Sequence, residues 1–228
     1  MMEFLFLDLD DTILDFHKAE RIALAKTLES FDVAPDDEVL ARYHVINLQH
    51  WERLETGELT RDQVQEGRFR VLFQELGREV DPVAVTRTYE RNLGIGHYFL
   101  PGAEEAVQSL HKKYRLFLAS NGTASVQHSR LTSAGLYPYF EKVFVSQDIG
   151  YNKPARDYFE ACFRQIPDFC PERAIMVGDS LTSDILGGIN AGIRTCWVNP
   201  AHAPARANIQ PDYEIENLSQ LEEVLKTL

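Results

Sequence analysis

The sequence has no long hydrophobic run and few cysteines. Its first apolar run, at residues 4–7, stops at Asp8, has no basic region before it, and is far shorter than a signal peptide or a membrane span of about 20 residues. The three cysteines, Cys162, Cys170 and Cys196, contain no CxxC pair, and their odd number suits neither a disulfide framework nor a zinc knuckle. We therefore expect reduced thiols in a cytoplasmic protein that does not associate with a membrane.

The chain also lacks an excess of positive charge. It has 23 Lys and Arg against 35 Asp and Glu, for a net charge of −12, and such a field repels nucleic acid polymers and anionic lipid surfaces. An anionic ligand must then be small and locally held. The seven histidines form no HxxxH or HExxH arrangement, which argues against a histidine-rich zinc site. No repeat or low-complexity tract is present, and no feature indicates an obligate protein partner.

What the sequence does contain is a regular alternation of short apolar runs and amphipathic stretches. With 228 residues, 44% of them hydrophobic, the chain can bury a substantial core. Unbroken apolar runs are typical of parallel strands buried on both faces, and helical periodicity follows at residues 103–110 and 159–166. This order predicts an α/β fold, with a doubly wound, Rossmann-like parallel sheet. The expected strands lie at residues 4–7, 116–118, 143–145, 175–177 and 196–198.

Prolines, glycines and capping residues indicate where the expected helices begin and end. Pro101 and Pro154 are expected in first helical turns, and Gly135 and Gly192 at helix ends. Asn217, with Gln220 three residues later, resembles a capping box for the last helix. Residues 199–212 contain three prolines and predict a loop.

The alternation of expected strands and helices stops at residues 15–98, where the sequence predicts helix almost throughout. Helix starts are indicated at Asp36, at Thr60 with Gln63 three residues on, and at Asp81. A crossover between parallel strands needs only about a dozen residues. We therefore predict a core domain formed by residues 1–14 and 99–228, with an inserted α-helical cap domain at 15–98.

Acidic residues follow the first and fourth expected strands. Asp8 and Asp10 face one side of the chain, since the side-chain period of a strand is two, and such close like charges call for a cation. Asp179 and Asp184 would complete an oxygen cage, and hard oxygen ligands favour Mg²⁺. The alternative for each motif is an acidic cap at a helix start.

The second and third expected strands are also followed by polar residues. Ser120 and Asn121 suit phosphate binding, and Lys153 suits charge compensation, although an ordinary turn and a surface lysine are the alternatives. All these residues would meet at the carboxyl ends of the strands, where open α/β sheets bind ligands. The chemistry they suit is phosphoryl transfer: Asp8 attacks phosphorus, while Asp10 protonates the leaving group and then deprotonates water.

The motifs, taken in order, closely resemble those of the haloacid dehalogenase superfamily. The resembling positions are DLDDT at residues 8–12, Ser120, Lys153, and the stretch from Gly178 and Asp179 to Asp184. The resemblance implies that Asp8 is phosphorylated. It also implies that magnesium is held by Asp8, the backbone carbonyl of Asp10 and Asp179, with Asp184 in support. The insertion would be a cap that opens and closes over small substrates.

Within the superfamily the chain most resembles bacterial pyrimidine 5′-nucleotidases. The segments that carry this resemblance are QEGRF at residues 65–69, NGT at 121–123, and 176–192 continuing to 195–197. The resemblance implies a nucleoside monophosphate substrate, non-standard ones included. Base recognition needs an aromatic face and hydrogen-bonding groups, for which Asn47, Trp51, Arg68 and Phe69 are candidates. A small helical core is the alternative for Trp51 and Phe69.

Rival functions differ in the residues they need. A dehalogenase would use a single Asp without a metal, which Asp10 and the later acids argue against. A phosphonate hydrolase would need a lysine in the cap, where only Lys18 and Lys26 occur. A receiver-like signalling module would carry its phosphorylated Asp later in the chain and have no helical insertion. A sugar phosphatase or phosphomutase of the same superfamily stays open as an alternative.

Overall fold

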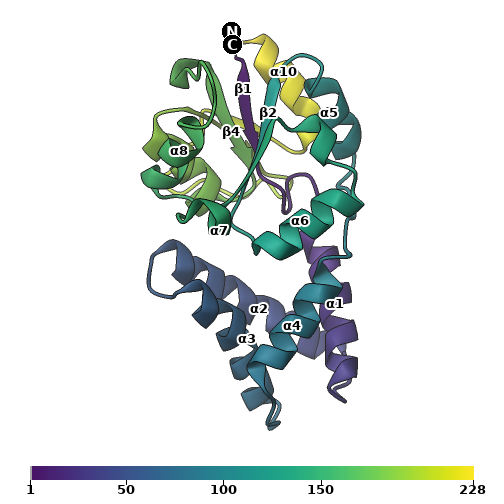
Figure 1. The fold of residues 1–228 in the computed structure, drawn as a ribbon. Coiled ribbons are helices and arrows are strands. Elements are labelled where there is room, and N and C mark those ends of the chain that lie inside the picture. The colour runs from purple at the N-terminus through teal and green to yellow at the C-terminus, as the bar shows by residue number, and fades with distance from the viewer. Residues whose placement is uncertain (1) are drawn as a thin grey trace. The chain divides into compact units, whose positions relative to one another are not determined.

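The computed structural model describes residues 2–228 and divides into two compact units (Figure 1). One unit, here called the α/β unit, comprises the chain up to Phe16 together with His97–Leu228. The other, here called the helical unit, comprises His17–Gly96. Each unit is described by itself.

The α/β unit is built on a six-stranded sheet in the order β3-β2-β1-β4-β5-β6, with every neighbouring pair parallel. The doubly wound fold predicted from the sequence is confirmed, and all five expected strands are present. The sixth strand was missed because it is an edge strand of three residues with one of them exposed. The strands are β1 (Phe4–Leu7), β2 (Arg115–Ser120), β3 (Lys142–Val145), β4 (Ala174–Gly178), β5 (Arg194–Val198) and β6 (Tyr213–Ile215).

Helices cover both faces of this sheet (Figure 1). On β1 alternate side chains pack in opposite directions: Leu5 and Leu7 join one apolar cluster and Phe4 and Phe6 another. The helices of this unit are α5 (Ala103–Leu110), α6 (Ala124–Ser133), α7 (Ser146–Ile149), α8 (Arg156–Phe163), α9 (Leu186–Ala191) and α10 (Leu221–Lys226). Short turns complete it at Tyr137–Tyr139, Pro171–Arg173 and Leu218–Gln220, with a π-helical turn at Leu181–Ile185.

The strand register places the polar residues of the site. Leu7 at the end of β1 pairs with Leu118 of β2 and with Val177 of β4. Asp8 therefore leaves β1 level with the ends of both neighbouring strands, and its backbone N–H donates to the Val177 carbonyl at 2.9 Å. The sheet edge formed by these strand ends carries the candidate site.

The helical unit contains four helices, and its predicted helix starts are confirmed. Asp36 and Asp81 cap α2 and α4 through their side chains, while Thr60 and Gln63 form a reciprocal capping box at α3. The helices are α1 (Phe16–Ser30), α2 (Asp37–Glu55), α3 (Arg61–Glu75) and α4 (Pro82–Leu93). No helix formed by residues 2–228 has both the length and the apolar character needed to cross a membrane.

Local predictions failed at three other helix starts. Pro101 and Pro154 each lie one residue before the N-cap, in the preceding turn, because the fixed φ of proline suits a turn as well as a first helical turn. Asn217 accepts from the Ser219 N–H, but the Gln220 side chain accepts from the Glu216 N–H, so the predicted capping box does not form. Gly135 and Gly192 do follow helix ends, with φ of 67° and 71°.

Candidate active site

Lys153 is the centre of the polar cluster at the carboxyl edge of the sheet. Its ammonium group is buried and donates to Asp8 Oδ1 at 2.6 Å, to Asp184 Oδ1 at 2.7 Å and to the Ala119 carbonyl at 2.6 Å. These partners come from the ends of β1, β2 and the turn after β4. One buried cation thus joins three separate segments of the sheet edge.

Three carboxylates gather around the same point. Asp8, Asp179 and Asp184 can each offer an oxygen, and these oxygens lie within 4.8 Å of one another. The Ser180 N–H donates to Asp184 Oδ2 at 3.1 Å, and this approach depends on Gly178, since a Cβ there would come within 2.1 Å of the same oxygen. The donor set is hard oxygen throughout, as Mg²⁺ requires.

The charge balance of the cluster also fits a cation. Burial raises the pKa of Asp8 to about 8, against the opposing effect of Lys153, and Asp184 and Asp10 raise it further. Burial likewise raises the pKa of Asp179 well above its ordinary value, with Asp184 and Asp8 adding to the effect. Burial lowers the pKa of Lys153, but Asp184 and Asp8 more than offset this and hold it above its usual range. One ammonium is too little positive charge for three carboxylates, and a divalent cation would restore the balance.

Asp10 is held separately, by two residues of α6. Gln127 Nε2 donates to Asp10 Oδ2 at 2.7 Å, and the guanidinium of Arg130 pairs with Asp10 Oδ1. Gln127 and Arg130 are both buried. The Asp10 carboxylate therefore lies outside the three-carboxylate cluster, with its two oxygens engaged from one helix.

Sequence reasoning missed Gln127 and Arg130. A pattern that could have revealed them is present, because these polar residues occupy the inward stripe of α6 beside Val126 and Leu131. Buried polar side chains require partners, so such positions point to a network. Gly122 makes room for it, since a Cβ there would lie 2.5 Å from the Gln127 side chain.

Ser120 and Asn121, at the end of β2, form hydrogen bonds with different parts of the site. Ser120 Oγ accepts from the Gly122 N–H at 3.1 Å and from Gln127 Nε2 at 2.8 Å, which connects it to the group that holds Asp10. Asn121 instead brackets the backbone of Lys153: its Nδ2 donates to the Lys153 carbonyl and its Oδ1 accepts from the Lys153 N–H, both at 2.8 Å. Asn121 thus orients the loop that carries the lysine.

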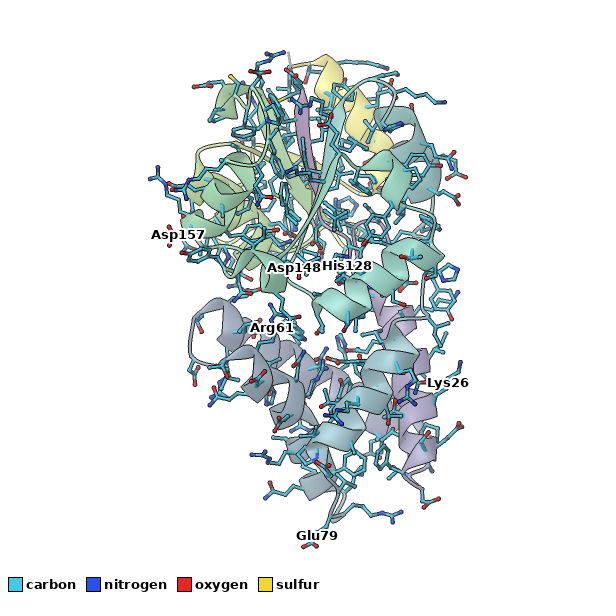
Figure 2. All side chains as sticks on the ribbon, viewed as in Figure 1. Lys26, Arg61, Glu79, His128, Asp148 and Asp157 are labelled. Carbon is cyan, nitrogen blue, oxygen red and sulfur yellow. The ribbon has the colours of Figure 1, made fainter. Side chains whose placement is uncertain are left out.

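An exposed pair connects α6 to α7, the helix that follows β3. His128 on α6 and Asp148 on α7 point toward one another (Figure 2), with 3.0 Å between His128 Nε2 and Asp148 Oδ2. The Ala124 N–H at the start of α6 also donates to Gln147 Oε1 at 2.9 Å. The element that positions Asp10 and the segment that leads to Lys153 are therefore tied to each other at the surface.

The four candidates for base recognition all lie in the helical unit. Phe69 is fully buried, stacks on Tyr43 at 5.2 Å between ring centroids, and is a core residue. Asn47 and Arg68 are also buried, and Arg68 Nη1 donates to Asn47 Oδ1 at 2.8 Å. Trp51 is half-buried and donates from Nε1 to Asn47 Oδ1 at 3.1 Å. Three of the candidates thus form one hydrogen-bonded group.

Comparisons with known proteins agree with this geometry. The model of the haloacid dehalogenase-like hydrolase family matches residues 2–192. The chain is 40% identical to the HAD-hydrolase YfnB of Bacillus subtilis over 97% of this chain and 94% of that protein. It is 38% identical to the pyrimidine 5′-nucleotidase PynA of Streptococcus pneumoniae (96% and 93% covered), and 30% identical to the pyrimidine 5′-nucleotidase YjjG of Escherichia coli (98% and 97% covered).

A crystal structure of YfnB bound to magnesium superimposes with a TM-score of 0.94, covering 98% of each chain. Both the sequence and the fold thus match over nearly the full length. The chain belongs to the haloacid dehalogenase-like hydrolase family.

Proposed function

We propose that this protein is a Mg²⁺-dependent phosphomonoester hydrolase that removes phosphate from pyrimidine nucleoside 5′-monophosphates through an aspartyl-phosphate at Asp8. The observation that carries the chemistry is the buried Lys153 ammonium, which contacts Asp8 and Asp184 at the edge where Asp179 also lies. Full-length relatives named pyrimidine 5′-nucleotidases support the substrate class.

In the first half of the reaction, an oxygen of Asp8 attacks phosphorus and the ester bond to the nucleoside oxygen breaks. Asp10 gives a proton to the departing alkoxide. Lys153 offsets negative charge on the phosphoryl oxygens, and Ser120 with nearby backbone N–H groups orients them. The phosphoryl group is then covalently bound to Asp8.

In the second half, Asp10 removes a proton from water, and the water oxygen attacks phosphorus. The bond between phosphorus and Asp8 breaks, which frees inorganic phosphate, restores the Asp8 carboxylate and leaves Asp10 protonated, as it was at the start of the cycle. Gln127 and Arg130 hold Asp10 by its two oxygens, so we assign them the positioning of the proton carrier.

The oxygen donors suited to magnesium are the carboxylates of Asp8 and Asp179 and the backbone carbonyl of Asp10, with Asp184 in support. A magnesium ion held there supplies positive charge that keeps Asp8 ionised and balances the phosphoryl oxygens. The Asp184 carboxylate is fixed by Lys153 and by the Ser180 N–H. EDTA should therefore inhibit the enzyme, and added Mg²⁺ should restore it.

We assign substrate selection to the helical unit, as the cap of the enzyme. The QEGRF segment of this unit is among those that resemble the pyrimidine nucleotidases. The crystal structure of YfnB bound to magnesium is described as revealing interdomain movement, which supports a cap that opens and closes. Within this cap, Trp51 is half-buried, and the Arg61 guanidinium lies over its ring at 5.5 Å from the ring centroid.

The test is a phosphate-release screen in Mg²⁺ over nucleoside monophosphates and sugar phosphates. UMP, dUMP and dTMP should be hydrolysed faster than purine monophosphates and hexose phosphates. Equal rates on all substrates would leave a phosphatase without the proposed specificity. Faster release from sugar phosphates would favour the sugar phosphatase alternative, and no release from any substrate would contradict phosphatase activity itself.

A further inference from the structure

The helical unit contains a second cluster of metal-ligating side chains, formed by His17, Glu20 and His44. Each can offer one ligand atom, and these atoms lie within 4.8 Å of one another. His17 and Glu20 stand three residues apart on α1 and therefore share a helix face, while His44 comes from α2. The two imidazole rings meet edge to face with centroids 4.8 Å apart.

The donor types differ from those of the magnesium cluster. Two imidazole nitrogens and one carboxylate make a set that borderline metals such as Zn²⁺ prefer, and that Mg²⁺ does not. Three protein ligands with water in the fourth position is a common zinc arrangement. His17 is exposed, so solvent can supply both the entry path and that fourth ligand.

Glu20 is a buried carboxylate with a fixed orientation. It is 4% exposed, and its two oxygens are engaged by different residues: Asn47 Nδ2 lies 2.6 Å from Oε1, and His44 Nδ1 lies 2.7 Å from Oε2. Asn47 is itself held by Arg68 and Trp51 through its Oδ1. Residues that hydrogen-bond to a metal ligand and fix its orientation commonly raise the affinity for the metal.

The contact between His44 and Glu20 is already close to that in a zinc site, whereas the ligand atoms of the whole cluster lie within 4.8 Å of one another and the exposed His17 side chain would have to move inward. Zinc bonds of about 2.0–2.2 Å in tetrahedral geometry would place the His44 nitrogen and the Glu20 oxygen roughly 3.3 Å apart. They are now 2.7 Å apart, as in a hydrogen bond. Binding would therefore widen this contact by about 0.6 Å, and a neutral His44 would carry its proton on the other ring nitrogen.

We propose that His17, Glu20 and His44 bind one Zn²⁺ ion, which links α1 to α2 inside the helical unit. The spacing of histidines along the sequence argues against a histidine-rich zinc site, but here the ligands come from two helices. The site is separate in its residues and in its metal preference from the carboxylate cluster of the α/β unit.

Such a link has a clear mechanical consequence. The Arg21–Asp37 ion pair joins α1 to the start of α2, but both side chains are largely exposed, and exposed pairs contribute little to stability. A metal held by both helices would fix α1 firmly. Because the ion binds the folded protein, it would raise the unfolding temperature, and the increase grows with the logarithm of the zinc concentration divided by Kd.

The test is calorimetric titration of the full-length protein with Zn²⁺ while excess Mg²⁺ occupies the carboxylate cluster. We expect one zinc ion per chain, and a higher unfolding temperature in its presence. His17→Ala and His44→Ala should each weaken binding at least ~100-fold, and Asn47→Ala about 10–100-fold, the usual cost of losing a residue that orients a ligand. Circular dichroism without zinc checks that each variant is folded. Because His17 is exposed, His17→Ala should disturb folding least of the three substitutions.

Two matched variants complete the experiment. His111→Ala removes an exposed histidine of the α/β unit and should bind zinc as the wild type does. Asp179→Asn alters the carboxylate cluster and should also keep the zinc site. No zinc binding in excess Mg²⁺, unchanged binding in both histidine variants, or loss of binding only in Asp179→Asn would each overturn the proposal.

Discussion

Each unit of this protein contains a buried polar group that includes a carboxylate, but the two groups are held in different ways. In the α/β unit, Lys153 contacts Asp8 and Asp184, which follow the ends of neighbouring strands. In the helical unit, Glu20 is held by Asn47 and His44, which project from a neighbouring helix. The first group is positioned by backbone topology and the second by side-chain packing between helices.

The two groups also differ in charge and in their surroundings. The strand-end group has an excess of negative charge and raised carboxyl pKa values, which fits the metal and phosphoryl site proposed above. The helical group is close to an aromatic core made of Tyr43, Phe69 and Tyr89. Variants that separate catalysis from stability should therefore fall in different units.

The largest expected effect is on turnover, from Asp8→Asn. An amide cannot serve as the nucleophile, so we expect a loss on the order of 10⁴-fold or more. The measurement is phosphate release from UMP, with circular dichroism to confirm folding. Asp157→Asn, which changes an exposed aspartate of the same unit, should leave turnover unchanged. Turnover like that of the wild type in Asp8→Asn would refute the mechanism.

The next effect should be on stability, from Phe69→Ala in the helical unit. Removing a fully buried ring that packs on Tyr43 and Tyr89 should lower the free energy of unfolding by about 3–5 kcal/mol. Denaturant unfolding measures this change. Leu48→Ala, at a residue 52% exposed, should stay within about 0.5 kcal/mol. Equal effects in both variants would show that Phe69 is no core residue.

A smaller loss of turnover should follow from Asp10→Asn. A proton carrier typically contributes 10²–10⁴-fold, so kcat should fall by at least ~10²-fold. Asp148→Asn is the control and should leave turnover unchanged. Asp148 is exposed on α7, and an asparagine there can still accept a hydrogen bond from His128. If Asp10→Asn keeps the turnover of the wild type, another group carries the proton. The contacts of Gln127 and Arg130 with Asp10 would then have a structural role only.

The smallest effect is a pH dependence of magnesium binding. Because the folded-state pKa of Asp8 is raised from 3.8 to about 8, the metal-free folded protein binds more protons than the unfolded chain in that window. The contribution of Asp8 to stability is therefore present at low pH and is lost as the pH rises through about 8. Magnesium needs the ionised carboxylate, so its affinity should rise by up to about tenfold per pH unit and level off above about 8.

Calorimetric titration with Mg²⁺ in buffers of different ionisation enthalpy counts the protons released. The pH slope should shrink in Asp8→Asn, which has no proton to lose there. A magnesium affinity that does not change between about pH 6 and pH 8 would contradict the raised pKa. The comparison is the zinc titration of the helical unit, whose proposed ligands do not include Asp8, so the Asp8→Asn substitution should leave zinc binding unchanged.

Much of the architecture could be predicted because it depends on local patterns. Strands buried on both faces must be apolar throughout, so five of the six were visible as short runs. Capping at Asp36, Thr60 and Asp81 depends on residues within one helical turn. The edge strand β6 was missed, since three residues with an exposed centre have no distinctive pattern.

The site was predicted less evenly. Residues that follow strands meet at the sheet edge by topology alone, which explains why Asp8, Lys153 and Asp184 could be named in advance. Gln127 and Arg130 could not, because their role depends on which face of α6 turns inward. Asn121 stays a prediction as a phosphate-binding residue, and the structure adds that its amide hydrogen-bonds to the Lys153 backbone.

The sequence by itself determined the order of strands and helices, the acids and the lysine at the strand ends, and hence the class of chemistry. Only the tertiary structure decided which side chains hold Asp10, and that His17, Glu20 and His44 meet. The physical reason is the sequence separation between the residues that interact. Strand burial and helix capping are set by residues close in sequence, whereas contacts such as His44 with Glu20, 24 residues apart, exist only after the helices have packed.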